Sequence, residues 1–336
     1  MLGNMQLLGE GRDAVIYYGK GANGHMFELT RTLIMYDGNQ WSDKQFIKVV
    51  NKDNIAQNAK NRSSKRNVIS PPTEIDILNY VMHPNISQLL HAAEDKEYLV
   101  MFTAVPCAGD LLSTSLHSPL NSVELILCMS QCAAALEYIH DKHIVHRDVK
   151  PQNISLFQAQ NGNDQTLHVR LSDFGFARVC DINGRCHTLV GSREYVSPEF
   201  VHTSRGSKRG YGRKHDVWSA GITMYFAASG IMPFLEYVEL DDQIVTPSDL
   251  SFNPDLPGLK PLSEYDHYVS HPRNLFGPKP FELKSKLAKG KHIPLPMELL
   301  IRKALVHNES VRATGAKWRK QLCFHIVRSE IERILV

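Results

Sequence analysis

The first part of the chain carries short runs of β-branched and aromatic residues, which is the pattern of strands. Such runs lie at residues 15–18 (VIYY), 27–36 and 46–50 (FIKVV), and residues 37–39 (DGN) between the last two indicate a turn. Another strand is predicted at residues 98–102. The polar stretch between the third run and the first helix is interpreted as a solvated loop. This part is therefore predicted to be rich in β-sheet.

Helical periodicity dominates the remainder of the chain. The first helix is predicted to open at residues 70–72 (SPP), because proline is tolerated in a first helical turn. Asn121, followed three residues later by Glu124, has the spacing of a capping box. Further helices are predicted over residues 217–229, ended by Gly230, and from Gly315 onward. The last helix is expected to bury a stripe centred on positions 323, 327, 331 and 334, widened by positions 322 and 326.

Length, composition and charge narrow the class of protein. The chain has 336 residues, about twice the length of a typical single domain, so two domains or one two-lobed unit are expected. Apolar residues make up 43% and charged residues 22%, which is the composition of a globular protein. A formal net charge of +3 is too small to predict a nucleic-acid partner.

The cysteine spacing and the apolar segments indicate the cellular compartment and whether the chain crosses a membrane. The six cysteines include no C-x-x-C pair and no zinc-ligand spacing, which favours reduced thiols in the cytoplasm or nucleus. The N-terminal residues lack the pattern of a signal peptide. Residues 217–235 carry no charge over 19 positions, but their serine, threonine, glycine and proline content is poor for a lipid environment. We interpret this segment as a buried core helix and expect no membrane span.

Several residues in the sheet-rich part are weak functional signals when each is taken alone. Gly9 and Gly11 stand just ahead of a strand, where most glycine pairs belong to ordinary turns. Lys48 lies inside the apolar run FIKVV, where a lysine usually reaches out to solvent. Glu74 on the next helix follows 26 residues later, and a buried pair between the two is one alternative.

Two polar segments further on give the strongest functional signal. Residues 146–153 read HRDVKPQN, and residues 173–175 (DFG) follow with Asp173 placed 25 positions after Asp148. Asp148, Lys150, Asn153 and Asp173 together supply two carboxylates, an amide oxygen and an ammonium group. Phosphoryl transfer needs these groups, since a carboxylate accepts the proton of the attacking hydroxyl, oxygen ligands hold magnesium, and a cation neutralises developing charge.

At these residues the chain resembles the eukaryotic protein kinases, over roughly residues 5–325 and in the correct order. Lys150 after the aspartate, together with Ser192, is similar to the serine/threonine branch. The resemblance implies an α+β, bilobal protein-kinase fold with a small β-rich N-lobe and a large helical C-lobe. The expected lobes are residues 1–103 and 104–336, which together form one kinase domain.

The resemblance also implies a site for ATP and Mg²⁺, with Mn²⁺ as a substitute. Asp148 would be the catalytic base, Lys150 would contact the γ-phosphate, and Lys48 with its partner Glu74 would hold the other phosphates. Asn153 and Asp173 would bind the metal. The glycine-rich loop, adenine slot and hinge would be formed by Leu8, Gly9, Glu10, Gly11, Arg12, Asp13, Ala14, Val15, Ile16, Phe46, Lys48, Met101, Phe102, Ala104 and Ser155.

Residues 188–199 (TLVGSREYVSPE) resemble the end of an activation segment. The resemblance implies that Glu199 pairs with Arg312 and that Asp216 braces the catalytic loop from the start of the central helix. Phosphate on Thr188 would bring negative charge that Arg147 can pair with, so regulation by phosphorylation is expected. The alternative is that Thr188 is an unmodified loop residue.

Three positions depart from the family pattern around adenine. Ala14 replaces the third glycine of the loop, and Phe46 replaces a small alanine in the roof of the slot. Ser155 replaces a bulkier floor residue, so we hypothesise that ATP binds with a shifted adenine. The alternative function is a pseudokinase scaffold whose adenine pocket is narrowed by Phe46 and which acts through partner binding.

The expected partners are protein substrates with serine or threonine acceptors. The insertions at residues 19–44 and 236–280 are either docking segments for a regulatory protein or simple loop extensions. Residues 161–164 are expected to extend a hairpin between the magnesium ligands. Cys180 and Cys186 flank the activation segment, where two free thiols are favoured over a redox clasp.

Overall fold

The computed structural model describes residues 5–10, 14–20, 27–29, 32–34, 44–51, 74–94, 98–104, 106, 108–161, 164–204, 206–230, 232–233, 238–240, 243–245 and 293–334. The chain divides into two compact units. The smaller unit comprises Met1–Met82 and Ser87–Cys107, and the larger one His83–Ile86 and Ala108–Val336. Each unit is described by itself. The assignment of residues 1–103 and 104–336 to two lobes remains a prediction.

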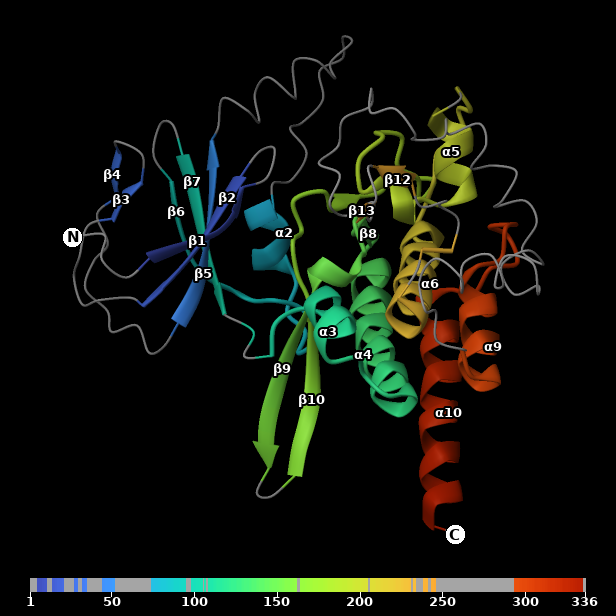
Figure 1. The fold of residues 1–336 in the computed structure, drawn as a ribbon. Helices are drawn as coiled ribbons and strands as arrows, with labels where there is room; N and C mark the ends of the chain where they lie inside the picture. Colours follow the sequence, from blue (N-terminus) through green and yellow to red (C-terminus); the bar gives the residue numbers. More distant parts are fainter. Residues whose placement is uncertain are drawn as a thin grey trace. The chain divides into compact units, whose positions relative to one another are not determined.

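The smaller unit is built on an antiparallel five-stranded sheet in the order β1-β2-β5-β7-β6 (Figure 1). Its strands are β1 (Met5–Glu10), β2 (Ala14–Lys20), β5 (Lys44–Asn51), β7 (Tyr98–Ala104) and β6 (Leu89–Glu94). The strands predicted at residues 15–18, 46–50 and 98–102 are therefore confirmed. The strands β1 and β6 were not predicted, because their sequences MQLLGE and LLHAAE have no β-branched residue and no Phe, Tyr or Trp.

One helix of the smaller unit lies against this sheet. The helix α2 (Glu74–Tyr80) brings Ile75 onto the buried side chains of Leu99 and Met101 from β7. The predicted start of this helix at residues 70–72 lies outside the described residues.

The prediction of a single strand over residues 27–36 is wrong. Two short strands, β3 (Phe27–Leu29) and β4 (Thr32–Ile34), pair with each other as a separate antiparallel hairpin. A run of β-branched residues cannot distinguish one long strand from two short ones when no Gly, Pro, Asn or Asp marks the connection.

The larger unit is mainly helical. Its helices are α3 (Leu111–His117), α4 (Ser122–Asp141), α5 (Pro198–Ser204), α6 (Lys214–Ser229), α9 (Leu295–Ala304) and α10 (Gly315–Ile334). The helices α4, α6 and α10 pack against one another, and α9 packs on α6 and α10 (Figure 1). The helix α6 is buried along almost its whole length and ends, as predicted, at Gly230, whose φ of 77° is the left-handed conformation that glycine favours.

The buried face of α10 agrees with the predicted stripe at Leu322 but differs from it at Cys323. Trp318 and Leu322 are fully buried, whereas Cys323 is only partly buried and Phe324 is exposed. The indole N–H of Trp318 donates to the backbone oxygen of Leu300 at 3.0 Å, which fixes the core-facing side of the helix at positions 318 and 322. The side chains at 327, 331 and 334 lie outside the described residues.

Short strands and turns carry the polar segments of the larger unit. The strands β9 (Ile154–Asn161) and β10 (Asp164–Leu171) form the hairpin expected at residues 161–164. The strand β8 (Ile144–Val145) pairs with β11 (Arg178–Val179), and β12 (Val238–Leu240) pairs with β13 (Gln243–Val245). The described part of this unit also contains two 3₁₀ turns, η1 (Pro151–Asn153) and η2 (Arg193–Tyr195).

Among the described residues, one helix is long and apolar enough to cross a membrane, namely α4. Just over half of its most apolar window, 56%, is buried inside the protein, where it contacts α6, α10 and β10. Of the uncharged segment 217–235 noted in the sequence, residues 217–229 belong to the 16-residue helix α6.

The capping box at the start of α4 gives a first prediction. The Asn121 side chain accepts from the backbone N–H groups of Val123 and Glu124 at 2.9 and 3.0 Å, and Glu124 accepts from the Asn121 N–H at 2.8 Å. Asn121→Ala is expected to lower the free energy of unfolding by about 1 kcal/mol, because orphan N–H groups lose their acceptor. Urea denaturation checks this. The control Val123→Ala in the same turn should change stability by less than about 0.5 kcal/mol, and equal losses would contradict the capping role.

Candidate active site

The backbone at residues 146–147 is held by the buried carboxylate of Asp216. The side chain of Asp216, in the first turn of α6, is fully buried and accepts from the backbone N–H of His146 at 2.9 Å and of Arg147 at 2.8 Å. The imidazole Nε2 of His140 lies 2.8 Å from the same carboxylate. Burial alone would raise the pKa of Asp216, but the hydrogen bond from His140 and the neighbouring imidazoles hold this pKa below its ordinary value.

This carboxylate supports an unusual backbone conformation. Arg147 has a φ of 70°, a left-handed conformation that costs a non-glycine residue on the order of 1 kcal/mol or more. Two charge-assisted hydrogen bonds to the N–H groups of residues 146 and 147 stabilise that conformation. The turn directs the next side chain, that of Asp148, into a polar cluster.

Asp148 is the centre of this cluster and is almost completely buried. Its Oδ2 lies 2.8 Å from the ammonium of Lys150 and 3.2 Å from the amide nitrogen of Asn153. Its Oδ1 accepts from both the backbone N–H and the hydroxyl of Ser192, at 2.9 and 2.8 Å. The Ser192 hydroxyl in turn accepts from Lys150 at 2.9 Å. The structure thus brings the predicted residues Asp148, Lys150 and Asn153 together.

Gly191 is what allows Ser192 to reach Asp148. Its φ is 110°, and a Cβ at this position would lie 2.3 Å from the backbone oxygen of Arg147. Any side chain would therefore push the activation segment away from the catalytic loop. The sequence marked Ser192 only as a branch feature. Its double contact with Asp148 was missed, because neither a local pattern nor the family resemblance indicated this pair.

Asn153 and Asp173 lie on adjacent segments. The backbone oxygen of Asn153, the last residue of η1, accepts from the N–H of Ser172 at 2.9 Å. Ser172 directly precedes Asp173, so Asp173 lies next to this turn. The side-chain nitrogen of Asn153 donates to the Asp148 backbone oxygen at 2.8 Å as well as to its carboxylate. This fixes the amide orientation, and no donor in the described part of the chain reaches its Oδ1. Asp173 is exposed and has a φ of 58°.

The donor set fits magnesium. An amide oxygen and a carboxylate are the hard oxygen ligands that Mg²⁺ prefers, and the ion commonly takes its remaining ligands from phosphate and water. The described residues contain no cluster of three or more His, Cys, Asp or Glu side chains able to hold a metal ion. A metal at Asn153 and Asp173 would therefore depend on a phosphate-bearing ligand, as in phosphoryl-transfer enzymes.

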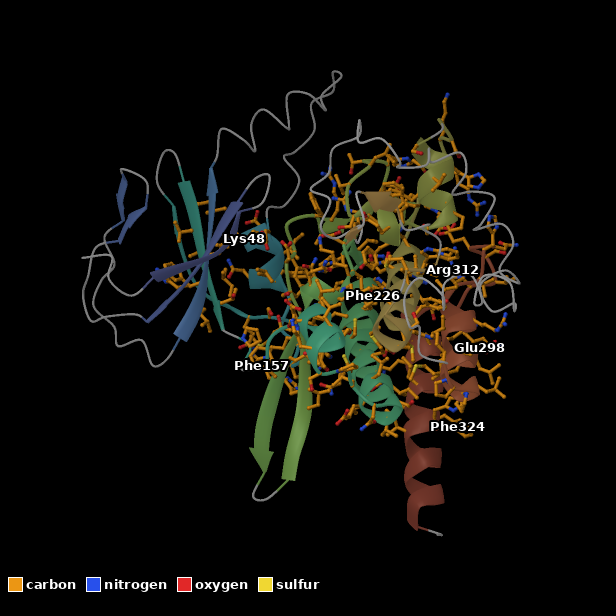
Figure 2. All side chains as sticks on the ribbon, in the orientation of Figure 1. Lys48, Phe157, Phe226, Glu298, Arg312 and Phe324 are labelled. Carbon is orange, nitrogen blue, oxygen red and sulfur yellow. The ribbon has the colours of Figure 1, made fainter. Side chains whose placement is uncertain are left out.

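The predicted pair of Lys48 and Glu74 is present in the smaller unit. Lys48 lies on β5 and is labelled in Figure 2. Its ammonium is 2.8 Å from the Glu74 carboxylate on α2, and both side chains are largely buried. On the neighbouring strands, Lys48 is opposite Ile16 and Met101. The other residues predicted to bind nucleotide are placed only in part.

Of the predicted glycine-rich loop, Leu8–Glu10 lie on β1 and Ala14–Ile16 on β2, whereas residues 11–13 lie outside the described residues. Phe46 occupies β5 opposite Tyr18 and Thr103, and its side chain is not described. Met101 and Phe102 are buried on β7, which ends at Ala104. In the larger unit, Ser155 is buried at the start of β9. The geometry around adenine therefore stays a prediction.

The predicted pair of Glu199 and Arg312 is a two-pronged ion pair, with N–O distances of 2.7 and 2.8 Å. The Arg312 guanidinium is buried, lies over the ring of Trp218, and also donates to the backbone oxygens of Lys214 and Val306. Burial would raise the pKa of Glu199, but Arg312 holds it below the ordinary value. The pair ties the end of the activation segment to α6 and to the segment before α10.

Thr188 is hydrogen-bonded to the segment that carries Asp148 and to Tyr211. The guanidinium of Arg147 donates to the Thr188 hydroxyl at 2.6 Å and, through Nε, to the Phe176 backbone oxygen at 2.6 Å. The Tyr211 hydroxyl donates to the Thr188 backbone oxygen. Tyr211 was not predicted, since no local motif marks it.

Gly191 gives a prediction with a matched control. Gly184 also has a positive φ, 70°, but a Cβ there would meet nothing within 4 Å. Gly184→Ala should therefore lower the free energy of unfolding by only about 1 kcal/mol, the penalty for a side chain at positive φ. Gly191→Ala should cost about 1–3 kcal/mol more, because it adds a steric overlap. Differential scanning calorimetry of the two variants measures this gap, and equal thermal shifts would show that the close approach at Arg147 is unimportant.

Comparison with known proteins agrees with this geometry. The protein kinase domain family matches residues 18–324. Serine/threonine-protein kinase ULK3 of Rattus norvegicus is 35% identical over 196 residues, which cover 56% of this chain and 38% of that protein. Serine/threonine-protein kinase ULK1 of Homo sapiens is 32% identical over 234 residues, covering 68% of this chain and 19% of that protein.

A third relative is serine/threonine-protein kinase DCLK1 of Rattus norvegicus, 33% identical over 165 residues that cover 48% of this chain and 35% of that protein. The chain thus spans less than two fifths of the length of these relatives. The family match covers most of the chain, and the relatives are all named as serine/threonine kinases. The chain belongs to the eukaryotic protein kinase family and to its serine/threonine branch.

Proposed function

We propose that this protein is an active serine/threonine protein kinase that transfers the γ-phosphoryl group of Mg-ATP to hydroxyl groups of proteins. The observation that carries this proposal is the cluster around Asp148, whose carboxylate contacts Lys150, Asn153 and Ser192 at 2.8–3.2 Å. A scaffold has no need for a buried carboxylate, an ammonium group and a fixed amide oxygen at one point of the fold.

Each residue of the cluster has a role that its chemistry supports. Asp148 orients the acceptor hydroxyl and takes its proton, while Lys150 neutralises charge on the transferred phosphoryl group. Asn153 and Asp173 would hold magnesium, or manganese as a substitute, which supplies positive charge beside the phosphate oxygens. Lys48, positioned by Glu74, would bind the phosphates nearer the nucleoside.

The remaining features of the proposal rest on the sequence. Phe46 and Ser155 differ from the usual adenine-slot residues, and we expect adenine to be shifted in the slot. Protein substrates are expected from the family, and the insertions at residues 19–44 and 236–280 are candidate docking segments for a regulator. The cytoplasm or the nucleus is the expected compartment, because the cysteine spacing favours thiols that are reduced except during transient oxidation.

Binding and transfer can be tested together. Mg-ATP should raise the thermal midpoint of the wild type, because a ligand that binds only the folded state stabilises it. Asp148→Asn should still be stabilised but should lose about 10²–10⁴-fold in phosphate transfer to a generic protein substrate, because the proton acceptor is gone. Incorporation of labelled phosphate measures the transfer.

Asp141→Asn serves as the control, since Asp141 is exposed at the end of α4 and should behave as the wild type. No stabilisation by Mg-ATP and no transfer by the wild type would instead support a pseudokinase scaffold with an adenine pocket narrowed by Phe46. Equal transfer by wild type and Asp148→Asn would contradict the assigned role of Asp148.

Phosphorylation of Thr188 is the proposed regulation. A phosphate brings about −1.5 to −2 charge, and Arg147 already reaches the Thr188 hydroxyl. Phosphatase treatment of the purified kinase should therefore lower its activity several-fold, and Thr188→Val should match the treated wild type. Ser207→Ala, at an exposed position of the following loop, should remain phosphatase-sensitive. Undiminished activity of Thr188→Val would refute the regulation.

A further inference from the structure

Cys180 and Cys186 stand opposite each other at the two ends of a tight loop. Within the loop, the N–H of Asp181 donates to the backbone oxygen of Arg185 at 2.9 Å, and the N–H of Arg185 donates to the Asp181 carboxylate at 2.9 Å. These bonds set residues 181 and 185 as a facing pair, so the next facing pair is 180 and 186. No backbone hydrogen bond joins residues 180 and 186 to each other. In antiparallel segments the Cα atoms are closest at pairs of this kind. The two sulfur atoms are 4.0 Å apart.

Both ends of the loop are anchored to the rest of the larger unit. The N–H of Cys180 donates to the backbone oxygen of His143 at 2.8 Å. Cys186 exchanges two backbone hydrogen bonds with Tyr211, at 2.7 and 3.0 Å. A disulfide needs an S–S distance of about 2.0 Å, so the sulfur atoms have to approach by about 2 Å. Rotation of the two cysteine side chains can bring the sulfur atoms this much closer. The backbone need not move, because the hydrogen bond between residues 181 and 185 already closes the loop.

The surroundings favour reaction at this pair. Cys180 is partly exposed and lines a cavity of about 440 Å³. The hydrogen bond from Cys180 holds the pKa of Cys186 below its ordinary value against the effect of burial, and the charges of Arg147 and Arg178 act in the same direction. The hydrogen bond with Cys186, together with burial, raises the pKa of Cys180, so Cys186 is the more easily ionised thiol of the pair. Cys128 and Cys132 on α4 differ because both are completely buried.

We propose that Cys180 and Cys186 are a modification site at which a peroxide forms an intramolecular disulfide across the 181–185 loop. One cysteine sulfur attacks an oxygen atom of the peroxide, and the O–O bond breaks. This cysteine becomes a sulfenic acid, and one molecule of water or alcohol is released. The second sulfur attacks the sulfenic sulfur, the S–O bond breaks, and water leaves. The two thiols lose two electrons and two protons, which the peroxide takes up.

The disulfide has a consequence for Thr188, which lies two residues beyond Cys186. The bridge fixes Cys186 against Tyr211, whose hydroxyl holds the Thr188 backbone while Arg147 holds the Thr188 hydroxyl. Thr188 has to leave these contacts before another kinase molecule can phosphorylate it. The bridge should therefore slow that phosphorylation. This consequence rests on the proposed function, whereas formation of the bridge does not.

The experiment treats the full chain with hydrogen peroxide and maps its peptides without reduction. A cross-linked peptide joining Cys180 and Cys186 is expected, with the mass of two hydrogen atoms lost and reversal by dithiothreitol. Cys180→Ser and Cys186→Ser should not form it, whereas Cys323→Ser, which changes a partly exposed cysteine on α10, should. Because Cys186 is buried, differential alkylation of the wild type before and after peroxide provides a measurement that does not depend on the variants.

Three results would overturn the proposal: both cysteines remaining open to alkylation after peroxide, oxidation to sulfinic acid without a bridge, or a bridge to a different cysteine. The rate of Thr188 phosphorylation, followed on the bridged and reduced protein, tests the consequence separately. If the bridge forms but the rate of Thr188 phosphorylation does not fall, the modification site is supported and its regulatory effect is contradicted. Absence of any phosphorylation in the reduced protein would count against the proposed function and not against the bridge.

Discussion

The larger unit depends on one buried anion, the carboxylate of Asp216. It stands in the first turn of α6, a helix buried along almost its whole length, and it accepts hydrogen bonds from two consecutive backbone N–H groups of the catalytic loop. A buried charge without partners is strongly unfavourable, so the loop conformation and the ionised state of Asp216 support each other. The left-handed turn at Arg147, and with it the direction of the Asp148 side chain, follows from this interaction.

The other polar contacts of the site build outward from that turn. Asp148 is fixed by Lys150, Asn153 and Ser192, and Ser192 can approach only because Gly191 has no side chain. Arg147 reaches from the same turn to Thr188. The activation segment is thus held at two points by neighbouring residues of one loop, and the Glu199–Arg312 pair holds its far end. A chemical change in this segment is therefore transmitted directly to the turn that carries Asp148.

The sequence predicted the chemistry of the site better than its supporting contacts. Asp148, Lys150, Asn153 and Asp173 could be named because they lie in short motifs with fixed spacing. The contact of Gly191 with the Arg147 backbone and the role of Tyr211 could not be found. They join segments far apart in the chain and, unlike the Glu199–Arg312 pair, were not implied by the family resemblance. Long-range contacts of this kind depend on how the activation segment folds back, which no local pattern records.

The same limit explains the errors in the fold. The strands β2, β5 and β7, which contain runs of β-branched and aromatic residues, were predicted, whereas β1 and β6 contain no such residues and were missed. The buried face of α10 is set by Trp318, whose indole bonds to Leu300, and an apolar stripe read from one helix alone cannot show which side its neighbours cover. Hairpins such as β9–β10 were predictable because Asn-Gly-Asn-Asp is a local turn signal.

Amide hydrogen exchange at residues 146 and 147 tests the role of Asp216 most directly. In the wild type these two N–H groups should be among the slowly exchanging amides of the larger unit. In Asp216→Asn, one of the two oxygen acceptors becomes an N–H₂ group, and exchange at residues 146–147 should accelerate while the core of α4 stays protected. Equal protection of these amides in wild type and Asp216→Asn would contradict the account, because the loop conformation would then be held by other contacts.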